Sequence, residues 1–387
     1  MSGNQADTGV WFVGARGSVA ATSVAGALAV RAGLAGTTGL VSELPEVARA
    51  GLVGLSNLVF GGHDVAEIPL PKRVEALAAG GVLPFHLPAV LANELAEVDG
   101  WIRPGVLAGE SSQRDAADRI VADLRAFRDA HGLDRIVVVD VSSTEPPITA
   151  GPDLANLAAL ERALDAGRSP LPASSLYAYA AFRAGCPVVA FTPSPGPRLP
   201  ALAELAAERG LPWAGSDGKT GETLLKSVLA PMFATRALRV RSWASVNLLG
   251  GGDGQTLADP AHAVSKTETK AQGLAAILGH PVDGPMHIDF VPDLGDWKTA
   301  WDHVSFEGFL GTRMSFQFTW AGCDSALAAP LVLDLVRLVA RAHEAGEVGP
   351  VAPFGFFFKD PAGSDEHRLA AQWDALSEWC ARVAESG

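Results

Sequence analysis

The sequence predicts an α/β fold in which a Rossmann-like domain, built on a parallel sheet, carries an inserted strand-rich α+β domain. In the first half, apolar runs of strand length at residues 10–13, 135–141 and 187–192 alternate with helical segments. Near-continuous apolar strands that alternate with helices are typical of a parallel sheet covered on both faces. After about residue 236, the period of the pattern changes to two, which is typical of half-buried antiparallel strands.

The first half opens with a strand, a tight turn and a helix. The apolar run 10–13 is followed by the turn Gly14-Ala15-Arg16-Gly17 and then by an alanine-rich segment. Further helices are expected at residues 115–131 and 174–184, between the apolar runs. This succession indicates the βαβ units of a nucleotide-binding sheet.

The second half places apolar side chains at every second position of residues 313–320. Residues 238–243 and 287–291 are also expected to form strands, and residues 325–345 and 367–384 to form helices. We therefore expect a nucleotide-binding domain made from residues 1–235 and 324–387. The strand-rich insertion then spans residues 236–323.

The composition limits the class of protein. The chain has 387 residues, of which 48% are hydrophobic, so it can bury a full core. Its formal charge of −13 at pH 7 opposes binding to nucleic acid, because repulsion would replace the usual release of counterions. Small-molecule partners are expected, and an anionic ligand would require a local cluster of cations.

Cysteine and histidine usage indicates a cytoplasmic protein without a metal site. Cys186, Cys323 and Cys380 are widely spaced and suggest neither a disulfide framework nor a zinc ribbon. The nine histidines show no metal-ligand spacing. The chain start lacks the basic segment of a signal peptide, and the apolar stretch 9–30 contains Arg16 and several glycines, so no membrane span is expected.

Two segments have the chemistry to hold phosphates, and each has a simpler interpretation. Gly14-x-x-Gly17-x-x-Ala20 would let the backbone approach a pyrophosphate at a helix N-terminus, or it is an ordinary tight turn. In residues 217–223, hydroxyls, free N–H groups and one lysine precede the helical stretch 224–233. The alternative for this segment is a capped helix in which Thr220 bonds the amide of Thr223.

Three lysines are candidates for catalysis. Lys266 and Lys270 are four residues apart, so they share one face if their segment is helical, although such pairs are commonly solvated. The glycine-rich loop 247–254 upstream is typical of close approach to a ligand. Lys359 follows three phenylalanines and is either partly desolvated or a residue at the end of an apolar run.

Together, these segments resemble the inositol-1-phosphate synthase family. The resemblance covers most of the chain, and the order and spacing of the segments make it specific. Its motifs occur at residues 60–64, 140–146, 174–180, 217–223, 226–229, 247–254, 265–270, 295–298 and 323–330.

The resemblance implies a Rossmann domain with tightly held NAD and an inserted catalytic and tetramerisation domain, assembled as a homotetramer. It also implies a redox-neutral cyclisation. A sugar 6-phosphate is oxidised at C5 by NAD, which acidifies C6. The C6 carbanion attacks a carbonyl of the same molecule, and the C5 ketone is then reduced again.

Site roles follow by resemblance. Lys266 is expected at the C5 oxygen, Lys359 at the attacked carbonyl and Lys270 at the phosphate, with Asp253 and Asp324 orienting these lysines. Ammonium groups in a closed site would stabilise the developing oxyanions. Contacts to phosphate or cofactor are expected from Thr220, Gly221, Glu222 and Thr223, and the NAD site from Gly14, Gly17, Asp64, Ser142, Ser143 and Asp217.

Several residues depart from the family's pattern around the sugar. Asp289 stands where the family has a catalytic lysine close to the substrate, so either the substrate lies differently or Asp289 points elsewhere. Gly251 and Gly252 replace asparagine, Glu222 replaces glutamine, and the cofactor turn lacks the usual glycine-rich pattern. We expect fructose 6-phosphate as the substrate, whose C6 would attack the C2 ketone and close a five-membered ring of the kind found in carbocyclic nucleosides.

Three alternatives remain open at the level of sequence. The enzyme could convert glucose 6-phosphate to 1L-myo-inositol 1-phosphate. It could be a sugar-phosphate dehydrogenase that releases NADH. It could also be an inactive binding homologue, which the charge reversal at Asp289 keeps open.

Overall fold

The computed structural model describes residues 7–106, 112–149, 151–251, 274–275 and 277–385. Its larger part is built on a seven-stranded parallel sheet of strand order β11-β6-β5-β4-β1-β2-β3. The α/β prediction is thereby confirmed. The strands are β1 (Thr8–Val13), β2 (Leu58–Asp64), β3 (Ile102–Pro104), β4 (Arg135–Asp140), β5 (Val188–Ala190), β6 (Pro212–Gly215) and β11 (Gly349–Pro350).

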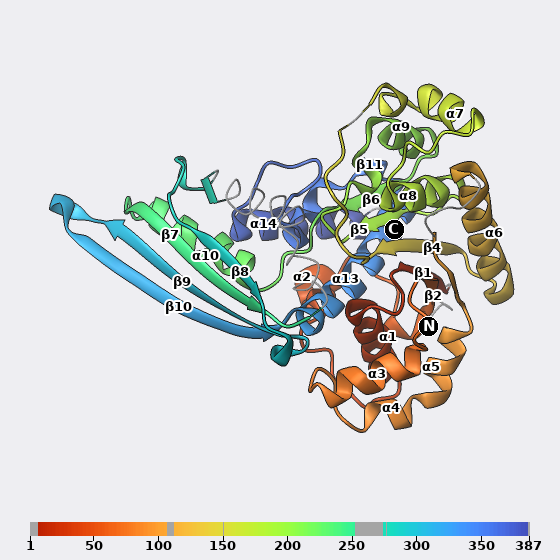
Figure 1. The fold of residues 1–387 in the computed structure, drawn as a ribbon, viewed down its shortest axis with the longest axis horizontal. Coiled ribbons are helices and arrows are strands. Elements are labelled where there is room, and N and C mark those ends of the chain that lie inside the picture. The colour runs from red at the N-terminus through yellow and green to blue at the C-terminus, as the bar shows by residue number, and fades with distance from the viewer. Residues whose placement is uncertain (1–6, 107–111, 150, 252–273, 276, 386–387) are drawn as a thin grey trace.

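Helices cover both faces of this sheet (Figure 1). One face carries α1 (Ser18–Arg31), α3 (Leu70–Ala79), α13 (Asp324–Glu344) and α14 (Leu369–Glu385), with the short helices α2 (Pro45–Ala48), α4 (Leu87–Val90) and α5 (Ala92–Asp99). The other face carries α6 (Gln113–His131), α7 (Leu157–Asp165), α8 (Ala173–Arg183) and α9 (Pro200–Glu208).

The continuous apolar character of the central strands follows from this double cover. In β4, Val137 and Val139 enter the core beneath α1 and α13, whereas Ile136 and Val138 enter the core beneath α6 and α8. Successive side chains of a strand point to opposite faces, so a strand covered on both sides has no position for a polar residue. This is why the runs 10–13 and 135–141 could be recognised as buried strands.

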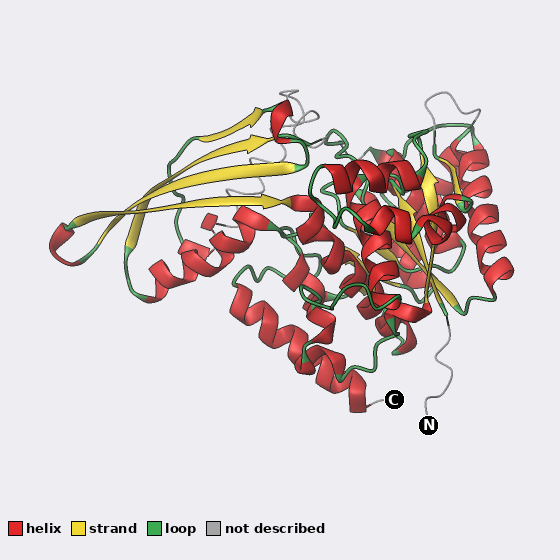
Figure 2. Cartoon of the chain, turned by 90° about the horizontal axis from the view of Figure 1, so that it is seen from below, coloured by secondary structure: helices red, strands yellow, loops and turns green. Residues whose placement is uncertain are grey.

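A second sheet extends to one side of the nucleotide-binding domain (Figures 1 and 2). Its order is β10-β9-β7-β8, with β7 parallel to β8 and the other pairs antiparallel. The strands are β7 (Arg239–Leu249), β8 (Met286–Phe290), β9 (Trp297–Glu307) and β10 (Arg313–Cys323). The expected strand at residues 313–320 therefore forms the first part of β10, at the outer end of the sheet.

Strand β9 was not expected from the sequence. Its inner-face positions carry Lys298, Ala300, Asp302 and Val304, so two ionisable residues interrupt the apolar alternation. Asp302 is nevertheless fully buried at 0% exposure, because other side chains satisfy it. Period-two patterns indicate strands only where the buried face is apolar.

Helix α10 (Gly221–Thr235) packs along one face of the second sheet. Phe233 is buried at 1% exposure, and its ring lies 5.0 Å from that of Phe306 and 6.4 Å from that of Trp243. The sequence assigned this helix to the nucleotide-binding domain, yet its apolar side chains contribute to the core of the second sheet. The division at residues 236 and 323 remains a proposal.

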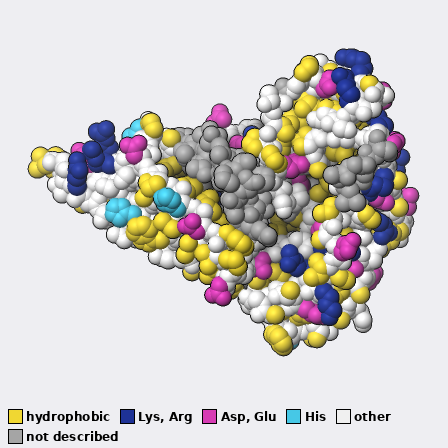
Figure 3. Space-filling model, viewed as in Figure 1, with side chains coloured by type: hydrophobic (Ala, Val, Ile, Leu, Met, Phe, Trp, Pro, Cys, Tyr) yellow, Lys and Arg dark blue, Asp and Glu magenta, His cyan; other side chains and the backbone are white. Residues whose placement is uncertain are grey.

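The opposite face of the second sheet is open and displays hydrophobic and histidine side chains (Figure 3). On β9, Trp301 lies on the face opposite to the buried Ala300 and Asp302, is 40% exposed, and has its ring 6.2 Å from that of His303. Exposed apolar surface of this kind commonly marks a protein interface. None of the helices in the described ranges is both long and apolar enough to cross a bilayer.

Replacing Phe233 by alanine should destabilise the second sheet by about 3–5 kcal/mol, because it leaves a cavity beneath two aromatic rings. We expect a lower urea midpoint, measured by tryptophan fluorescence. Met232→Ala on the same helix is the matched control, since Met232 is 42% exposed. Equal midpoints for the two variants would contradict the packing of α10 on the sheet.

Candidate active site

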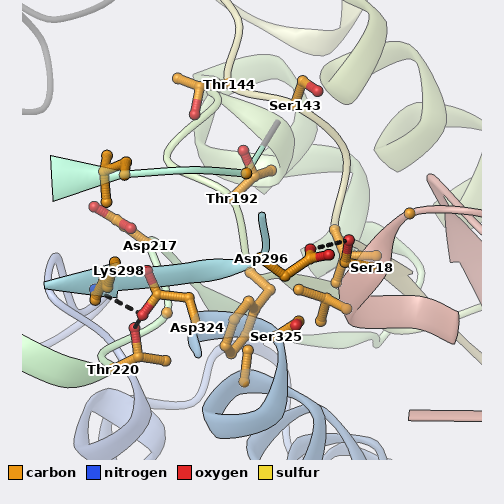
Figure 4. Close-up of a pocket in the computed structure, with 18 of the residues that line it drawn as sticks. Ser18, Ser143, Thr144, Thr192, Asp217, Thr220, Asp296, Lys298, Asp324 and Ser325 are labelled. Carbon is orange, nitrogen blue, oxygen red and sulfur yellow. Dashed lines mark hydrogen bonds and ion pairs between the residues drawn. The ribbon is translucent and has the colours of Figure 1, made fainter. Parts of the chain in front are cut away.

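A cavity of about 300 Å³ lies between the carboxyl edge of the parallel sheet and the inner end of the second sheet. Loops after β1, β4 and β5 form one wall, and the ends of β7, β8 and β9 form another. Figure 4 shows hydroxyl and carboxylate side chains from both parts of the molecule pointing into it. The strand order reverses between β1 and β4, and ligands of open α/β sheets bind at this point.

The turn after β1 is shaped for close approach to the backbone. Gly14 has φ +85°, and a Cβ atom there would lie 3.1 Å from the Cα of Ser142. The amides of Gly14 and Ala15 both donate to the carbonyl of His63, at 2.9 and 3.1 Å. Only glycine fits at position 14, so the interpretation as a ligand-binding turn gains support over that of an ordinary tight turn.

The N-termini of three helices, α1, α10 and α13, meet at the cavity. None of the residues that precede them, Gly17, Thr220 and Cys323, caps its helix with a side-chain hydrogen bond. The first N–H groups of these helices are therefore available to anions, which the helix dipoles also favour. The first turns of α10 and α13 contain Glu222 and Asp324, whereas that of α1 contains no acidic residue.

Thr220 is the N-cap residue of α10, but its side chain does not bond the amide of Thr223, so the expected capping bond is wrong. Its Oγ1 instead donates to Asp324 Oδ1, at 3.1 Å. The lysine of the same segment, Lys219, also turns away from the cavity and donates to Gln372 of α14. Burial lowers the pKa of Lys219 to about 7. Its ammonium group therefore lies in the fold and not where a phosphate would bind.

Lys298 and Asp324 join the second sheet to the nucleotide-binding domain. Lys298 Nζ lies 2.7 Å from Asp324 Oδ1, and both residues line the cavity with Thr220 (Figure 4). A Cβ atom on Gly221 would lie only 3.0 Å from Lys298 Nζ. The first turn of α10 therefore lies directly beside an ammonium group.

Lys359 is partly desolvated, as one of the two interpretations held. Its side chain is 12% exposed, and Nζ lies 2.7 Å from Oδ1 of Asp217, whose side chain is 6% exposed. The two residues lie on facing segments. The amide of Lys359 donates to the carbonyl of Asp217 at 2.7 Å, and Gly218 and Phe358 form an isolated antiparallel β-bridge. Asp217, expected at the cofactor, thus also orients a lysine.

A buried ionic network lies behind the cavity wall. Glu222, which lines the cavity at 2% exposure, forms an ion pair with Lys226, one turn later in α10. Asp302 Oδ1 lies 3.8 Å from Lys226 Nζ and accepts from Trp243 Nε1 at 2.7 Å and from Ser245 Oγ at 2.5 Å. Burial and the charge of Glu222 raise the pKa of Asp302. Two carboxylates thus share one ammonium group, which holds Glu222 in place at the wall.

Asp140 fixes the orientation of Ser142 at the end of β4. Its Oδ1 accepts from the amide of Ser142 at 3.0 Å and from the Ser142 hydroxyl at 2.6 Å. Burial raises the pKa of Asp140 to about 6. Because the hydroxyl proton of Ser142 is committed to Asp140, the oxygen offers lone pairs to a ligand. It would accept from a hydroxyl or amide group.

The structure brings many of the predicted residues together and leaves others apart. Gly14 and Gly221 lie in the backbone of the wall, next to Ser142 and Lys298. Lys266, Lys270 and Asp253 fall outside the described residues. The predicted residues that line the cavity are Gly17, Ser142, Ser143, Asp217, Thr220, Glu222, Thr223, Asp324 and Lys359.

Asp64 and Asp289 do not line the cavity. Asp64 ends β2 and accepts from the amides of Arg16 and Ala66, at 2.6 and 2.7 Å. Asp289 is exposed and pairs with Leu248 in the β7–β8 register, on the face opposite to Ile288, which does line the cavity. In the part of the chain that the structure describes, the carboxylate of Asp289 therefore lies on the face turned away from the cavity, and its role at the substrate stays a prediction.

Several residues at the cavity were not identified as site residues from the sequence, and four of them carry charged or amide side chains that matter for the site. Lys298 and Asn247 lay within motifs that were recognised, but no charge pattern singled them out. Asp296 reaches the start of α1, where Ser18 Oγ donates to its Oδ1 at 2.7 Å (Figure 4). Arg73 lies on α3, and no local signal in the sequence connects it with the turn after β1.

Comparison with known proteins identifies relatives along the whole chain. A family model described as myo-inositol-1-phosphate synthase matches residues 8–381. The inositol-3-phosphate synthase 1 of Bacteroides thetaiotaomicron is 32% identical over 405 residues, which cover 96% of this chain and 92% of that protein.

Two solved structures share the fold. An inositol-3-phosphate synthase from Caenorhabditis elegans superposes with a TM-score of 0.89 at 20% identity, covering 98% of this chain and 86% of that one. A myo-inositol-1-phosphate synthase-related protein from Thermotoga maritima gives a TM-score of 0.78 at 25% identity, covering 97% and 98%. The likeness extends through both sheets, since nearly the whole chain is covered.

Asp140→Asn should change how stability depends on pH. The carboxyl group has a pKa of about 6 in the folded chain against 3.8 for the model compound, so its contribution is fully present below pH 3.8 and is lost as the pH rises through 6. The unfolding free energy of the wild type relative to Asp140→Asn should fall by about 3 kcal/mol over this window. Urea titrations at several pH values measure the difference, with the exposed Asp374→Asn as control, and a flat difference would contradict the burial of Asp140.

Proposed function

The chain belongs to the myo-inositol-1-phosphate synthase family, and we propose that its substrate is fructose 6-phosphate, which it closes to a five-membered cyclitol phosphate. The coarser activity follows from the family. Its members are intramolecular lyases or isomerases that use NAD, so this chain is an NAD-dependent enzyme that cyclises a sugar phosphate.

The described residues fit a dinucleotide at the turn after β1. Gly14 permits close approach of the backbone, α1 has no acidic residue in its first turn, and Asp64 stands at the end of β2, where an acidic residue can bind a ribose. We propose that Gly14, Gly17, Ser142, Ser143 and Asp217 contact NAD, with Asp64 at the adenosine end. NAD, when bound, accepts two electrons and a proton from C5 and returns them, so no net NADH forms.

The observation that carries the choice of substrate is the carboxylate of Glu222 in the cavity wall. Where the family has glutamine, which can donate an N–H to a phosphate, this chain holds a carboxylate against Lys226. An ionised carboxylate only accepts hydrogen bonds, so it favours sugar hydroxyls and opposes a phosphate. Fructose 6-phosphate carries a C1 hydroxymethyl group where open-chain glucose 6-phosphate has its aldehyde.

The absence of the family's lysine at position 289 also favours fructose 6-phosphate as the substrate. Asp289 occupies the strand position of a family lysine, and its side chain lies outside the lining of the cavity. The described cavity offers Lys298 and Lys359, each already held by a carboxylate. We propose that this arrangement stabilises an oxyanion at the C2 carbonyl of a ketose.

The proposed chemistry balances within the substrate. C5 loses its hydroxyl proton and a hydride, C6 then loses a proton, and a bond forms between C6 and C2. The C2 oxygen gains a proton, and the hydride and one proton return to C5, so its hydroxyl group is restored. We propose that Lys359, whose ammonium group is held by Asp217, supplies the proton to the C2 oxygen. We propose Lys266 at the C5 oxygen and Lys270 at the phosphate, with Asp253 and Asp324 as their orienting groups.

We also propose that the enzyme is a cytoplasmic homotetramer in which another copy covers the open face of the second sheet. The exposed side chain of Trp301 on this face supports this assembly. Three buried cysteines that form no disulfide are compatible with a reducing compartment.

Incubation with NAD and each hexose phosphate tests the substrate. Fructose 6-phosphate should give a carbocyclic phosphate, detected by 13C NMR, without stoichiometric absorbance from NADH. Glucose 6-phosphate should give little product, because it lacks the hydroxymethyl group. Inositol phosphate from glucose 6-phosphate at an equal rate would overturn the choice of substrate, stoichiometric NADH would indicate a simple dehydrogenase, and no product from either would indicate a binding homologue.

Lys298→Met should lower kcat/KM by roughly 100-fold or more, because it removes an ammonium group beside the first turn of α10 and leaves Asp324 unpaired in the cavity. Adding Asp324→Asn should recover part of the loss by removing the unpaired charge. Initial rates of cyclitol formation measure both effects, and Lys72→Met on the surface is the control. A double variant as impaired as the sum of both single changes would argue against this pairing.

A further inference from the structure

Arg73 is a cation of the cavity that has no acidic partner among the described residues. It lies in the first half of α3, and its Nε donates to the carbonyl of Arg16 at 3.0 Å. Within the described ranges, its two terminal nitrogens form no hydrogen bond or ion pair. Lys298 and Lys359, the other cations that line the cavity, are each bound to a carboxylate. In a chain with a net charge of −13, an arginine without a counterion is available to an anionic ligand.

Arg73 lies next to the turn that leads into α1. The carbonyl that it binds belongs to the turn between Gly14 and Gly17, and the same cavity is lined by Gly17 and Ser18. Because Nε is bound to the carbonyl of Arg16, the guanidinium group is held next to the turn that leads into α1. Arg16 itself is not available, since its side chain binds Asp99 and the carbonyl of Ala66.

A positive group is needed here because a carboxylate is already present. Asp296 Oδ1 accepts from Ser18 Oγ at the first residue of α1, so an anion that approaches this helix meets a negative charge. The helix dipole is equivalent to about half a positive charge, which is too little to offset a full carboxylate. Arg73 supplies the remaining charge in the lining of the cavity.

We propose that Arg73 is a cofactor-binding residue whose two free nitrogens bind the pyrophosphate of NAD at the start of α1. The planar guanidinium fork suits two phosphate oxygens, and the bond from Nε to the turn orients it before the ligand arrives. The proposal rests on the family's use of NAD. A 2′-phosphate of NADP is disfavoured as the ligand, because Asp64 places a carboxylate at the end of β2.

Binding measurements on the full-length chain test this assignment without relying on activity. Calorimetry would give the affinities of wild type, Arg73→Ala and Arg73→Lys for NAD and ADP, and ligand-observed NMR the affinity for adenosine. Arg73→Ala should weaken NAD and ADP by about 10- to 100-fold, the value of charge-assisted hydrogen bonds, and leave adenosine unchanged. Arg73→Lys should be intermediate, because it keeps the charge but loses the fork.

Lys72→Ala is the matched control, since Lys72 is the preceding residue of α3 and its side chain is 64% exposed. Equal loss in both variants would assign the effect to net charge and overturn the proposal. An equal loss of adenosine affinity would indicate stacking on adenine, and a loss confined to NADP would indicate a 2′-phosphate site; either result also overturns it. Wild-type protein that fails to bind NAD would refute the cofactor itself, whereas wild-type binding with unchanged Arg73→Ala refutes only the role of Arg73.

Discussion

The pairing of buried charge is the constraint on which the site depends. Lys298 and Asp324 form the ion pair that fastens the second sheet to the start of α13, and Lys359 and Asp217 form the pair that joins two loops across the cavity floor. The Asp217 side chain is 6% exposed and that of Asp324 is 40% exposed, so loss of the partner lysine is costlier at Asp217 than at Asp324. The charged groups proposed for catalysis therefore also hold the walls of the cavity together. Arg73 is the exception, and for that reason we assign it to a ligand.

The sequence predicted the fold where burial is two-sided and failed where buried positions are polar. Strand β4 could be recognised because each of its inner residues, Ile136 to Val139, fills one of two apolar cores. Strand β9 could not, because Lys298 and Asp302 occupy its inner face and are satisfied by residues far away in the chain. Local patterns carry information on which face is apolar, but not on which distant group will neutralise a charge.

The same limit applies to the site. Residues within ordered motifs, such as Thr220 and Ser142, were found because the family's spacing marks them. Arg73 carries no such mark, because its place at the turn after β1 arises only when α3 folds back over Arg16. The lysine of residues 217–223 was a plausible phosphate ligand, but strand-like pairing with the segment before Lys359 turns Lys219 toward α14. Side-chain direction at such places is set by tertiary contacts.

The junction between β10 and α13 contains no linker. Strand β10 ends at Cys323 and helix α13 begins at Asp324, so a long sheet continues directly into a 21-residue helix of the nucleotide-binding domain. The first turn of α13 is therefore attached directly to the inner end of the second sheet. Because Asp324 is the residue that holds Lys298, a displacement of the inner end of β10 would also displace this ion pair in the cavity.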